Sequence, residues 1–370
     1  MGVRFRRATR PLAIVAVVGV LAVAIYFLGD SAGGGTAHLE KSAGALHPST
    51  DPGSESESVE ESTPQAEPAP QSESDSESVS GGEAQEGWQA AIDSRDISQI
   101  REWYEANTGV TGLYDPELDR QLLYEDLEVY DAGGGYLEST YPGQVIERLD
   151  VVNTQGLLIR HPDVTIRAVR IVPSNEYDFS VVLDQPDGGF GDGITLEYVT
   201  IDGLSQSENI AGTIWNTTVR HLHLRGHRSG FHLGGDVTIE DSYIHSQVIT
   251  PDSHNTAVSN HGGGQNITLR RNFLEGSTSS ALSLYPDNGP LSDHTIENNI
   301  FDGNDASYSV YGGCTDSKFY GQDNERIVFR DNYFLPGRHG NAVWQCTSPR
   351  WGPGHVWTGN RHLVSGESIP

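Results

Sequence analysis

The sequence predicts an all-β solenoid, a right-handed parallel β-helix with a short helical cap at its N-terminal end. Two observations predict it. A short strand-like pattern recurs through residues 164–362 at intervals of 20–33 residues, the signature of a repeat architecture. The chain of 370 residues also holds 43 glycines and only two cysteines, a composition that favours strands and turns over helical bundles or a disulfide-dense scaffold.

Residues 1–32 read as an Arg-rich cytoplasmic flank followed by a membrane segment. The apolar run from Leu12 to Leu28 carries no charge and is long enough to span a bilayer. The basic flank consists of Arg4, Arg6, Arg7 and Arg10, which places it inside and the rest of the chain outside the cytoplasm. We expect an uncleaved single-pass anchor in the cell membrane. A cleaved signal peptide, and hence a secreted protein, is the alternative.

Residues 33–86 form an acidic Ser/Glu/Pro linker that cannot bury a core, and we expect it to be a disordered tether. The globular domain is residues 87–370. It carries 38 acidic and 18 basic side chains, and Lys318 is its only lysine. This balance argues against binding nucleic acid.

Residues 88–106 place Trp88, Ile92, Ile100, Trp103 and Tyr104 near helical spacing. Asp96 is a candidate N-cap. We expect one or two helical turns here that cover the open N-terminal end of the solenoid.

The repeat itself is built on an apolar anchor residue in each unit. The anchors are Ile166, Leu196, Val219, Ile239, Leu269, Ile296, Phe329 and Trp357. Alternation within each unit is strand-like, and the position five residues after the anchor is apolar in every unit but the last. Units of this length with several short strands predict a coiled parallel sheet rather than a propeller.

The position three residues after the anchor becomes asparagine in the last four units, at Asn272, Asn299, Asn332 and Asn360. Equivalent positions of neighbouring rungs stack about 4.8 Å apart. We therefore expect a structural ladder of stacked, hydrogen-bonded asparagines.

A second short strand precedes each later unit, for example at 256–258, 281–284 and 342–344. Cys314 and Cys346 each follow such a strand in adjacent rungs. The distance between rungs suits a disulfide, and an exported protein permits one.

At these residues the chain resembles exported bacterial parallel β-helix proteins of the pectin-lyase-like superfamily. The segments that carry the resemblance are residues 162–167, 237–245, 253–262, 265–270, 327–332 and 356–360. It implies the fold over residues 109–370. It also implies either a carbohydrate-active enzyme, chiefly a lyase or hydrolase of acidic polysaccharides, or a non-catalytic surface protein. The family often has Asp-Gly where this chain has Thr256-Ala257, so if that Asp is the catalytic acid or base of the family, this chain has lost it.

Polar side chains gather around residues 252–261 and in the neighbouring rungs. We take His254, His261, Tyr285 and Lys318 as the candidate catalytic residues. Candidate substrate-binding residues are His232, Asn255, Asn260, Asp287, Arg338 and His339. Asp252 and Asp287 are candidate Ca²⁺ ligands.

For β-elimination, His254 or His261 would be the base, Tyr285 the acid, and Lys318, Arg338 or Ca²⁺ the group that neutralises the enolate. Hydrolysis would need two facing carboxylates, and Asp252 and Asp287 are the obvious pair. Each residue could also serve only in turns or backbone contacts. The sequence favours a tethered protein that binds a polysaccharide or cell-wall glycan, with a lyase preferred if it is an enzyme. The alternative is a non-catalytic glycan- or protein-binding surface protein.

Overall fold

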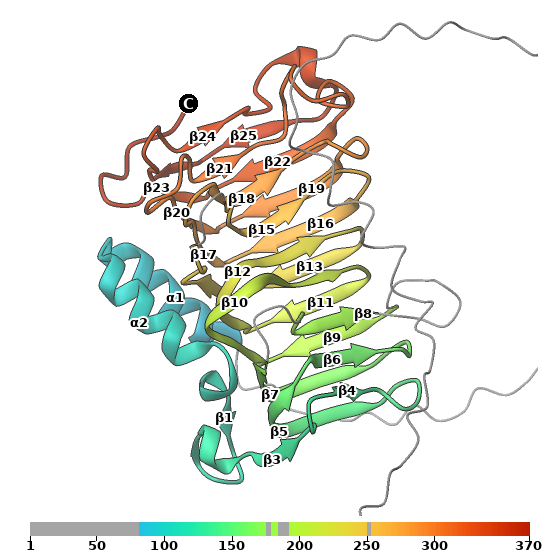
Figure 1. Cartoon of the computed structure of the whole chain (residues 1–370). Coiled ribbons are helices and arrows are strands. Elements are labelled where there is room, and N and C mark those ends of the chain that lie inside the picture. The colour runs from blue at the N-terminus through green and yellow to red at the C-terminus, as the bar shows by residue number, and fades with distance from the viewer. Residues whose placement is uncertain (1–80, 175–178, 184–191, 250–252) are drawn as a thin grey trace, which may run out of the picture. The chain divides into compact units, whose positions relative to one another are not determined.

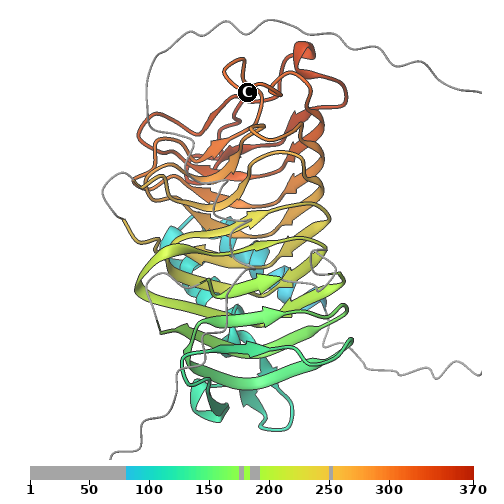
Figure 2. The same ribbon diagram turned by 45° about the vertical axis from the view of Figure 1, so that its right-hand side comes forward.

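The structure, a computed structural model, describes residues 81–174, 179–183, 192–249 and 253–370, and these residues lie within one compact unit. Strands coil in successive parallel rungs into a β-helix (Figures 1 and 2). The predicted solenoid is confirmed. The predicted membrane segment and most of the linker lie outside the described residues. Within those residues, neither helix has the length and apolar character needed to cross a bilayer.

The rungs have three sides. The first side holds the N-terminal parts of β5 (Val145–Thr154) and β7 (Thr165–Pro173), then β9 (Ile194–Glu197), β11 (Thr217–Arg220), β13 (Val237–Glu240), β16 (Gln265–Arg270), β19 (Ser292–Glu297), β22 (Glu325–Arg330) and β25 (Val356–Thr358). The second holds β3 (Glu128–Asp131), the C-terminal parts of β5 and β7, the N-terminal parts of β10 (Thr200–Ile214) and β12 (His223–Leu233), then β14 (Tyr243–His245), β17 (Phe273–Glu275), β20 (Ile300–Asp302), β23 (Tyr333–Leu335) and β26 (Arg361–His362).

The third side carries the candidate site. It holds β4 (Tyr136–Glu138), β6 (Gly156–Ile159), β8 (Val181–Leu183), the C-terminal parts of β10 and β12, then β15 (Thr256–Asn260), β18 (Ser280–Leu284), β21 (Val310–Tyr311) and β24 (Ala342–Val343). All these pairings are parallel. Before the first rung, β1 (Tyr114–Asp115) and β2 (Arg120–Gln121) form a small antiparallel pair.

The apolar anchors of the repeat point inward. All eight belong to or pack against the central core, and seven are fully or almost fully buried, such as Ile166, Ile239 and Ile296. Each rung contributes the same positions, so the core continues along the axis of the solenoid. Near its C-terminal end Cys314 and Cys346 form the predicted disulfide, with a Cα–Cα distance of 5.2 Å.

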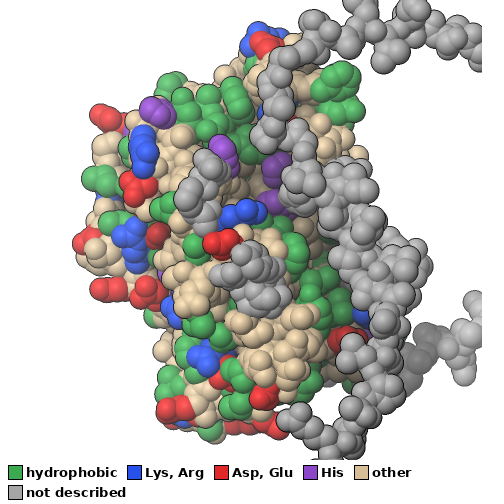
Figure 3. Space-filling view, viewed as in Figure 1, with side chains coloured by type: hydrophobic (Ala, Val, Ile, Leu, Met, Phe, Trp, Pro, Cys, Tyr) green, Lys and Arg blue, Asp and Glu red, His purple; other side chains and the backbone are tan. Residues whose placement is uncertain are grey.

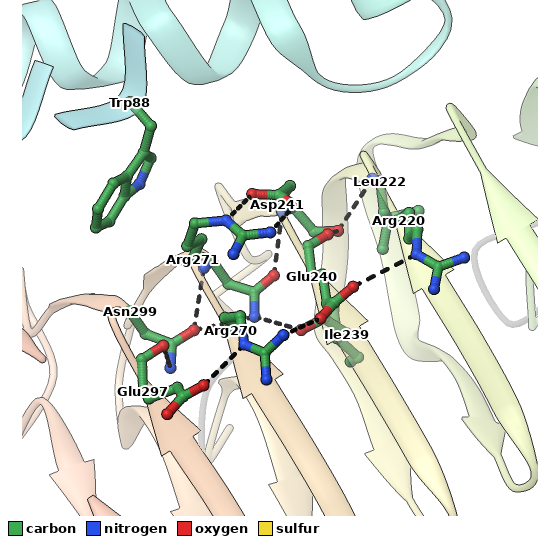
Figure 4. Close-up of polar contacts among 12 residues, drawn as sticks. Trp88, Arg220, Leu222, Ile239, Glu240, Asp241, Arg270, Arg271, Glu297 and Asn299 are labelled. Atoms are coloured by element: carbon green, nitrogen blue, oxygen red, sulfur yellow. Dashed lines mark hydrogen bonds and ion pairs between the residues drawn. The ribbon is translucent and has the colours of Figure 1, made fainter. Parts of the chain in front are cut away.

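The corner between the first and second sides repeats the same turn in each rung. The residue at that corner has a positive φ in nine successive rungs: Arg148, Ala168, Tyr198, His221, Asp241, Arg271, Asn298, Asp331 and Gly359. The next residue points inward, and in the last four rungs it is the stacked asparagine. The Oδ1 atom of Asn299, which is labelled in Figure 4, accepts hydrogen bonds from the backbone N–H and the Nδ2 of Asn272, both at 3.0 Å. Asn332 and Asn360 continue the pattern.

Outward-facing residues of the first side alternate in charge from rung to rung. In register they are Glu147, Arg167, Glu197, Arg220, Glu240, Arg270, Glu297 and Arg330. Ion pairs link five of the neighbouring pairs at 2.8–3.8 Å, and those around Glu240 and Arg270 appear in Figure 4. In the sequence these charged residues directly follow the apolar anchors. Their alternation in sign would have predicted the ion pairs between rungs.

Two helices, α1 (Gly81–Ser94) and α2 (Ile97–Asn107), precede the solenoid, and Asp96 caps α2 by accepting a hydrogen bond from the Ser98 N–H at 2.9 Å. The expectation that they cover the N-terminal end is wrong. They lie along the second side, beside β17 (Figure 1). There Ile100 and Tyr104 pack against the outward rings of Tyr243 and Phe273. Arg101 adds ion pairs to acidic side chains of β17 and β20 at 2.9 and 3.0 Å.

The physical reason for this placement is the amount of apolar surface on that side. Tyr243, Phe273, Ile300 and Tyr333 occupy the outward position in four successive rungs, and the helices bury them. Burial of this apolar surface stabilises the fold. From α2 the chain runs along the early rungs through the 3-10 turns Val110–Gly112 and Tyr124–Asp126.

Candidate functional site

A row of rings runs along the third side of the solenoid. We call it the aromatic stripe, and it consists of His232, His261, Tyr285, Tyr311 and Trp344. Successive ring centroids are 5.0, 5.6, 5.4 and 5.1 Å apart. Each ring comes from a different rung and each residue is partly exposed. Figure 3 shows histidines on the upper half of the face drawn in Figure 1, among hydrophobic side chains.

The repeat of the solenoid explains the spacing of the stripe, because one rung advances the chain by about 4.8 Å. His232 and Tyr311 occupy outward positions within their strands. At the two rungs between them the equivalent residues are Ser259 and Ser283. Both serines are fully buried. In these two rungs the ring of the stripe belongs to the residue two positions later, His261 after Ser259 and Tyr285 after Ser283.

One ion pair borders the stripe. The Nζ of Lys318 lies 2.5 Å from Oδ1 of Asp287 and 5.1 Å from the ring centroid of Tyr285. The Nδ1 of His261 lies 3.6 Å from Oδ2 of Asp287. The structure therefore brings together five of the predicted site residues: His232, His261, Tyr285, Asp287 and Lys318.

Burial keeps the histidines of the stripe neutral. It lowers the pKa of His261, although the Asp287 carboxylate opposes that shift. Burial, together with the neighbouring His261, lowers the pKa of His232 to about 3. Asp287 favours the tautomer of His261 with its proton on Nδ1, which leaves Nε2 as a hydrogen-bond acceptor. At neutral pH the stripe is thus a chain of uncharged rings beside a neutralised ion pair.

Other predicted site residues have structural roles or lie apart. The buried Asn255 side chain donates to the carbonyl of Val248. The buried Asn260 side chain accepts from the Gly262 N–H at 2.7 Å. Neither amide is accessible to a substrate, so we correct their assignment as binding residues.

His254 is exposed in the loop before β15, and the described residues show no contact between it and the stripe. Its assignment as a base gains no support from this placement. Arg338 and His339 are exposed in the loop before β24. His339 lies 5.8 Å from the ring of Tyr308, which in turn lies 5.6 Å from Tyr311.

The predicted calcium site lacks a supporting ligand set. Asp252 lies outside the described residues. Asp287 already pairs with the Lys318 ammonium, and a cation at that distance opposes binding of a second one. The described residues near Asp287 therefore do not fit Ca²⁺.

Sequence analysis missed Tyr308, Tyr311 and Trp344. A signal was present, because Tyr311 and Trp344 shortly precede Cys314 and Cys346. Since the predicted disulfide places those rungs side by side, it also places the two rings side by side.

His355 lies close to the two cysteines and could suggest a metal site. The cysteines are joined in the disulfide, however, and both ring nitrogens of His355 are engaged. Nδ1 accepts from the Ile327 N–H at 3.2 Å, and Nε2 lies 2.6 Å from the carbonyl of Trp351, in the 3-10 turn Pro349–Trp351. The disulfide and the hydrogen bonds of His355 therefore connect and stabilise the last rungs.

Comparison of the chain with protein-family models, with curated proteins and with solved structures finds no match.

Proposed function

We propose that this chain is a membrane-tethered, extracytoplasmic β-helix protein of the right-handed, pectin-lyase-like kind that binds a polysaccharide along the aromatic stripe. The observation that carries the proposal is the unbroken row of five rings, one per rung. Aromatic faces pack against the apolar faces of sugar rings while polar edges bind hydroxyl groups. Centroid distances of 5.0 Å from His232 to His261, 5.6 Å on to Tyr285 and 6.3 Å from Tyr285 to Trp344 limit the row to about 17 Å, which still suits a polymer rather than a monosaccharide.

Charge favours a neutral glycan as the ligand. Residues 87–370 carry 38 acidic and 18 basic side chains, which repel a polyuronate. Lys318, the one lysine of the domain, is neutralised by Asp287. We therefore expect a neutral chain, such as a cell-wall or environmental glycan, to bind more tightly than an acidic one.

Cleavage is the second candidate function, and the pair of His261 and Asp287 beside Tyr285 is the observation that favours it. His261 Nε2 could act as the base and Tyr285 as the acid of a β-elimination. That reaction also needs a positive group for the developing enolate, and Lys318 is already paired. Hydrolysis needs two facing carboxylates. Asp287 lies beside the stripe, whereas the other candidate, Asp252, lies outside the described residues. Binding without cleavage is therefore the better supported function.

The test is affinity electrophoresis of the full-length chain through gels that contain single polysaccharides, both neutral glucans, mannans and xylans and acidic polyuronates. We expect a neutral glycan to retard the protein. Tyr285→Ala and Trp344→Ala should each weaken binding about fivefold, since a ring contact contributes about 1 kcal/mol. Tyr141→Ala is the matched control, because Tyr141 is an exposed ring far from the stripe in the fold.

The same samples test cleavage. Unsaturated products, detected by ultraviolet absorbance and lost in His261→Ala, would show a lyase, whereas reducing ends without that absorbance would show a hydrolase. Retardation with neither product supports a binding protein. If no glycan retards the chain, or if the stripe variants bind as the Tyr141→Ala control does, the proposal is wrong.

A further inference from the structure

The N-terminal end of the solenoid exposes an unusual share of apolar surface. We define this end as residues 114–145, which lie at the bottom of Figures 1 and 2. Eleven large hydrophobic side chains are exposed among the described residues, and seven belong to this segment. They are Tyr114, Leu118, Leu123, Val129, Tyr130, Tyr141 and Val145. The helices, which could have covered this end, pack against the second side instead.

The same end carries an open strand edge. Among the described residues β3 pairs only with β5, and all four of its residues are exposed. Ala132, next along the chain, donates its N–H to the carbonyl of Val152 at 3.1 Å, which is on the β5 side. Because successive residues of a strand point their backbone groups to opposite edges, Val129 and Asp131 direct theirs away from β5. Such an edge can take up another strand.

The end is also strongly acidic. Residues 114–145 hold eight Asp or Glu and one Arg. Asp126 pairs with Arg120 at 2.6 Å and Asp115 with Arg148 at 2.8 Å. Glu138 lies 3.8 Å from Arg160. The other five acidic residues are exposed: Glu117, Asp119, Glu125, Glu128 and Asp131. Apolar side chains and negative charges therefore lie together around one open edge, and each face of β3 carries one of each: Glu128 with Tyr130, and Val129 with Asp131.

We propose that the N-terminal end binds an extended, basic segment of a partner protein by strand addition. Backbone hydrogen bonds to β3 would give affinity. Lys or Arg opposite Glu128 and Asp131, with apolar residues opposite Val129 and Tyr130, would match the side chains of this edge. A second copy of this chain fits less well, since it would bring Glu128 and Asp131 against like charges. Residues 33–86 of this chain are themselves acidic, which disfavours them as the occupant.

The test uses the full-length chain and fluorescently labelled octapeptides, with fluorescence anisotropy as the readout. We expect a peptide that repeats Lys-Val-Val-Lys to bind and one that repeats Glu-Val-Val-Glu not to bind. Affinity should fall as salt is raised. Val129→Pro removes one outward N–H donor without touching the β5 ladder and should weaken binding about tenfold or more. Val129→Thr, which keeps that N–H, is the matched control.

A second variant guards against a folding defect in Val129→Pro. Glu125→Lys combined with Glu128→Lys changes two exposed side chains and should reverse the preference, so that the Glu-Val-Val-Glu peptide binds better. Equal binding of both peptides, or an unchanged affinity in both variants, overturns the proposal. Concentration-dependent self-association in sedimentation, lost in Val129→Pro, would assign the end to a second copy and would also overturn it.

Discussion

At the scale of single residues, the stacked asparagines hold the corners of the last rungs together. Asn299 is fully buried. Its Nδ2 donates to the carbonyl of Leu269 at 2.8 Å and to Oδ1 of Asn332 at 3.1 Å, while its Oδ1 accepts from Asn272. Buried polar groups require such partners, because water is absent. One amide therefore satisfies two backbone groups of the preceding rung and bonds to the side chain of the following one.

Asn299→Ala should lower the free energy of unfolding by about 3 kcal/mol, since it leaves the buried N–H of Asn272 and the carbonyl of Leu269 without these partners. Guanidinium unfolding followed by circular dichroism measures the change. Asn288→Ala, at an exposed position, is the control and should change stability by less than about 0.5 kcal/mol. A loss below about 1 kcal/mol for Asn299→Ala would show that the ladder adds little.

At the scale of elements, the charges on the first side favour the observed order of rungs. Glu240 lies between Arg220 and Arg270, at 3.4 and 3.0 Å. The arginine side chains are more than a third exposed and the glutamate is largely buried, so solvent screens each pair and its net contribution is small. Like charges directly opposite each other on adjacent strands are unfavourable. The alternation thus disfavours any register that would pair like charges.

Glu240→Arg should therefore destabilise the fold by about 1 kcal/mol more than Glu240→Gln, which removes the charge but keeps the size. Urea unfolding at low salt gives the comparison. Because salt screens the repulsion, repeating the measurement in concentrated sodium chloride should reduce the difference between the two variants. If the variants are equally stable at low salt, the alternation of charge has no energetic role.

At the scale of the whole molecule, buried histidines link stability to pH. Burial lowers the pKa of seven of the twelve histidines in the described residues: His221, His223, His227, His232, His245, His261 and His294. The unfolded chain, where a histidine has a pKa near 6.5, then binds protons that the folded chain does not. Stability is fully present above about pH 6.5 and falls as the pH drops towards 4.

His294 allows a test of this linkage. It lies in the inward column between Ile267 and Ile327, its Nε2 is buried without a partner among the described residues, and burial lowers its pKa to about 4. The free energy of unfolding should fall between pH 6 and pH 5, and in His294→Ile this fall should be smaller by about 1 kcal/mol.

Unfolding in urea at the two pH values measures this change. His254→Ile, the same substitution at an exposed position, is the matched control. An unaltered dependence in His294→Ile would mean that this histidine takes up a proton equally in the folded and unfolded chain.

The sequence by itself determined the solenoid, the inward anchors and the disulfide. Each is a consequence of the repeat, because equivalent positions of successive rungs must lie one rung apart. The anchor positions therefore predicted the buried core, and the position three residues after each anchor predicted the stacking of Asn272 with the asparagines of later rungs. The same reasoning placed His261 and Tyr285 in adjacent rungs, which is why part of the candidate site was predictable.

Only the tertiary structure decided which outward positions are covered and which are open. Apolar residues at both of two adjacent positions, as at Tyr243 and Ile244 or Phe273 and Leu274, show that one of each pair faces outward, but not what buries it. Helices α1 and α2 do so, and this leaves the N-terminal end exposed. In the same way, the contact between Lys318 and Asp287 depends on the path of a long loop, which has no repeat to fix it. Periodicity determines the rungs, whereas contacts between segments outside the repeat depend on packing in three dimensions.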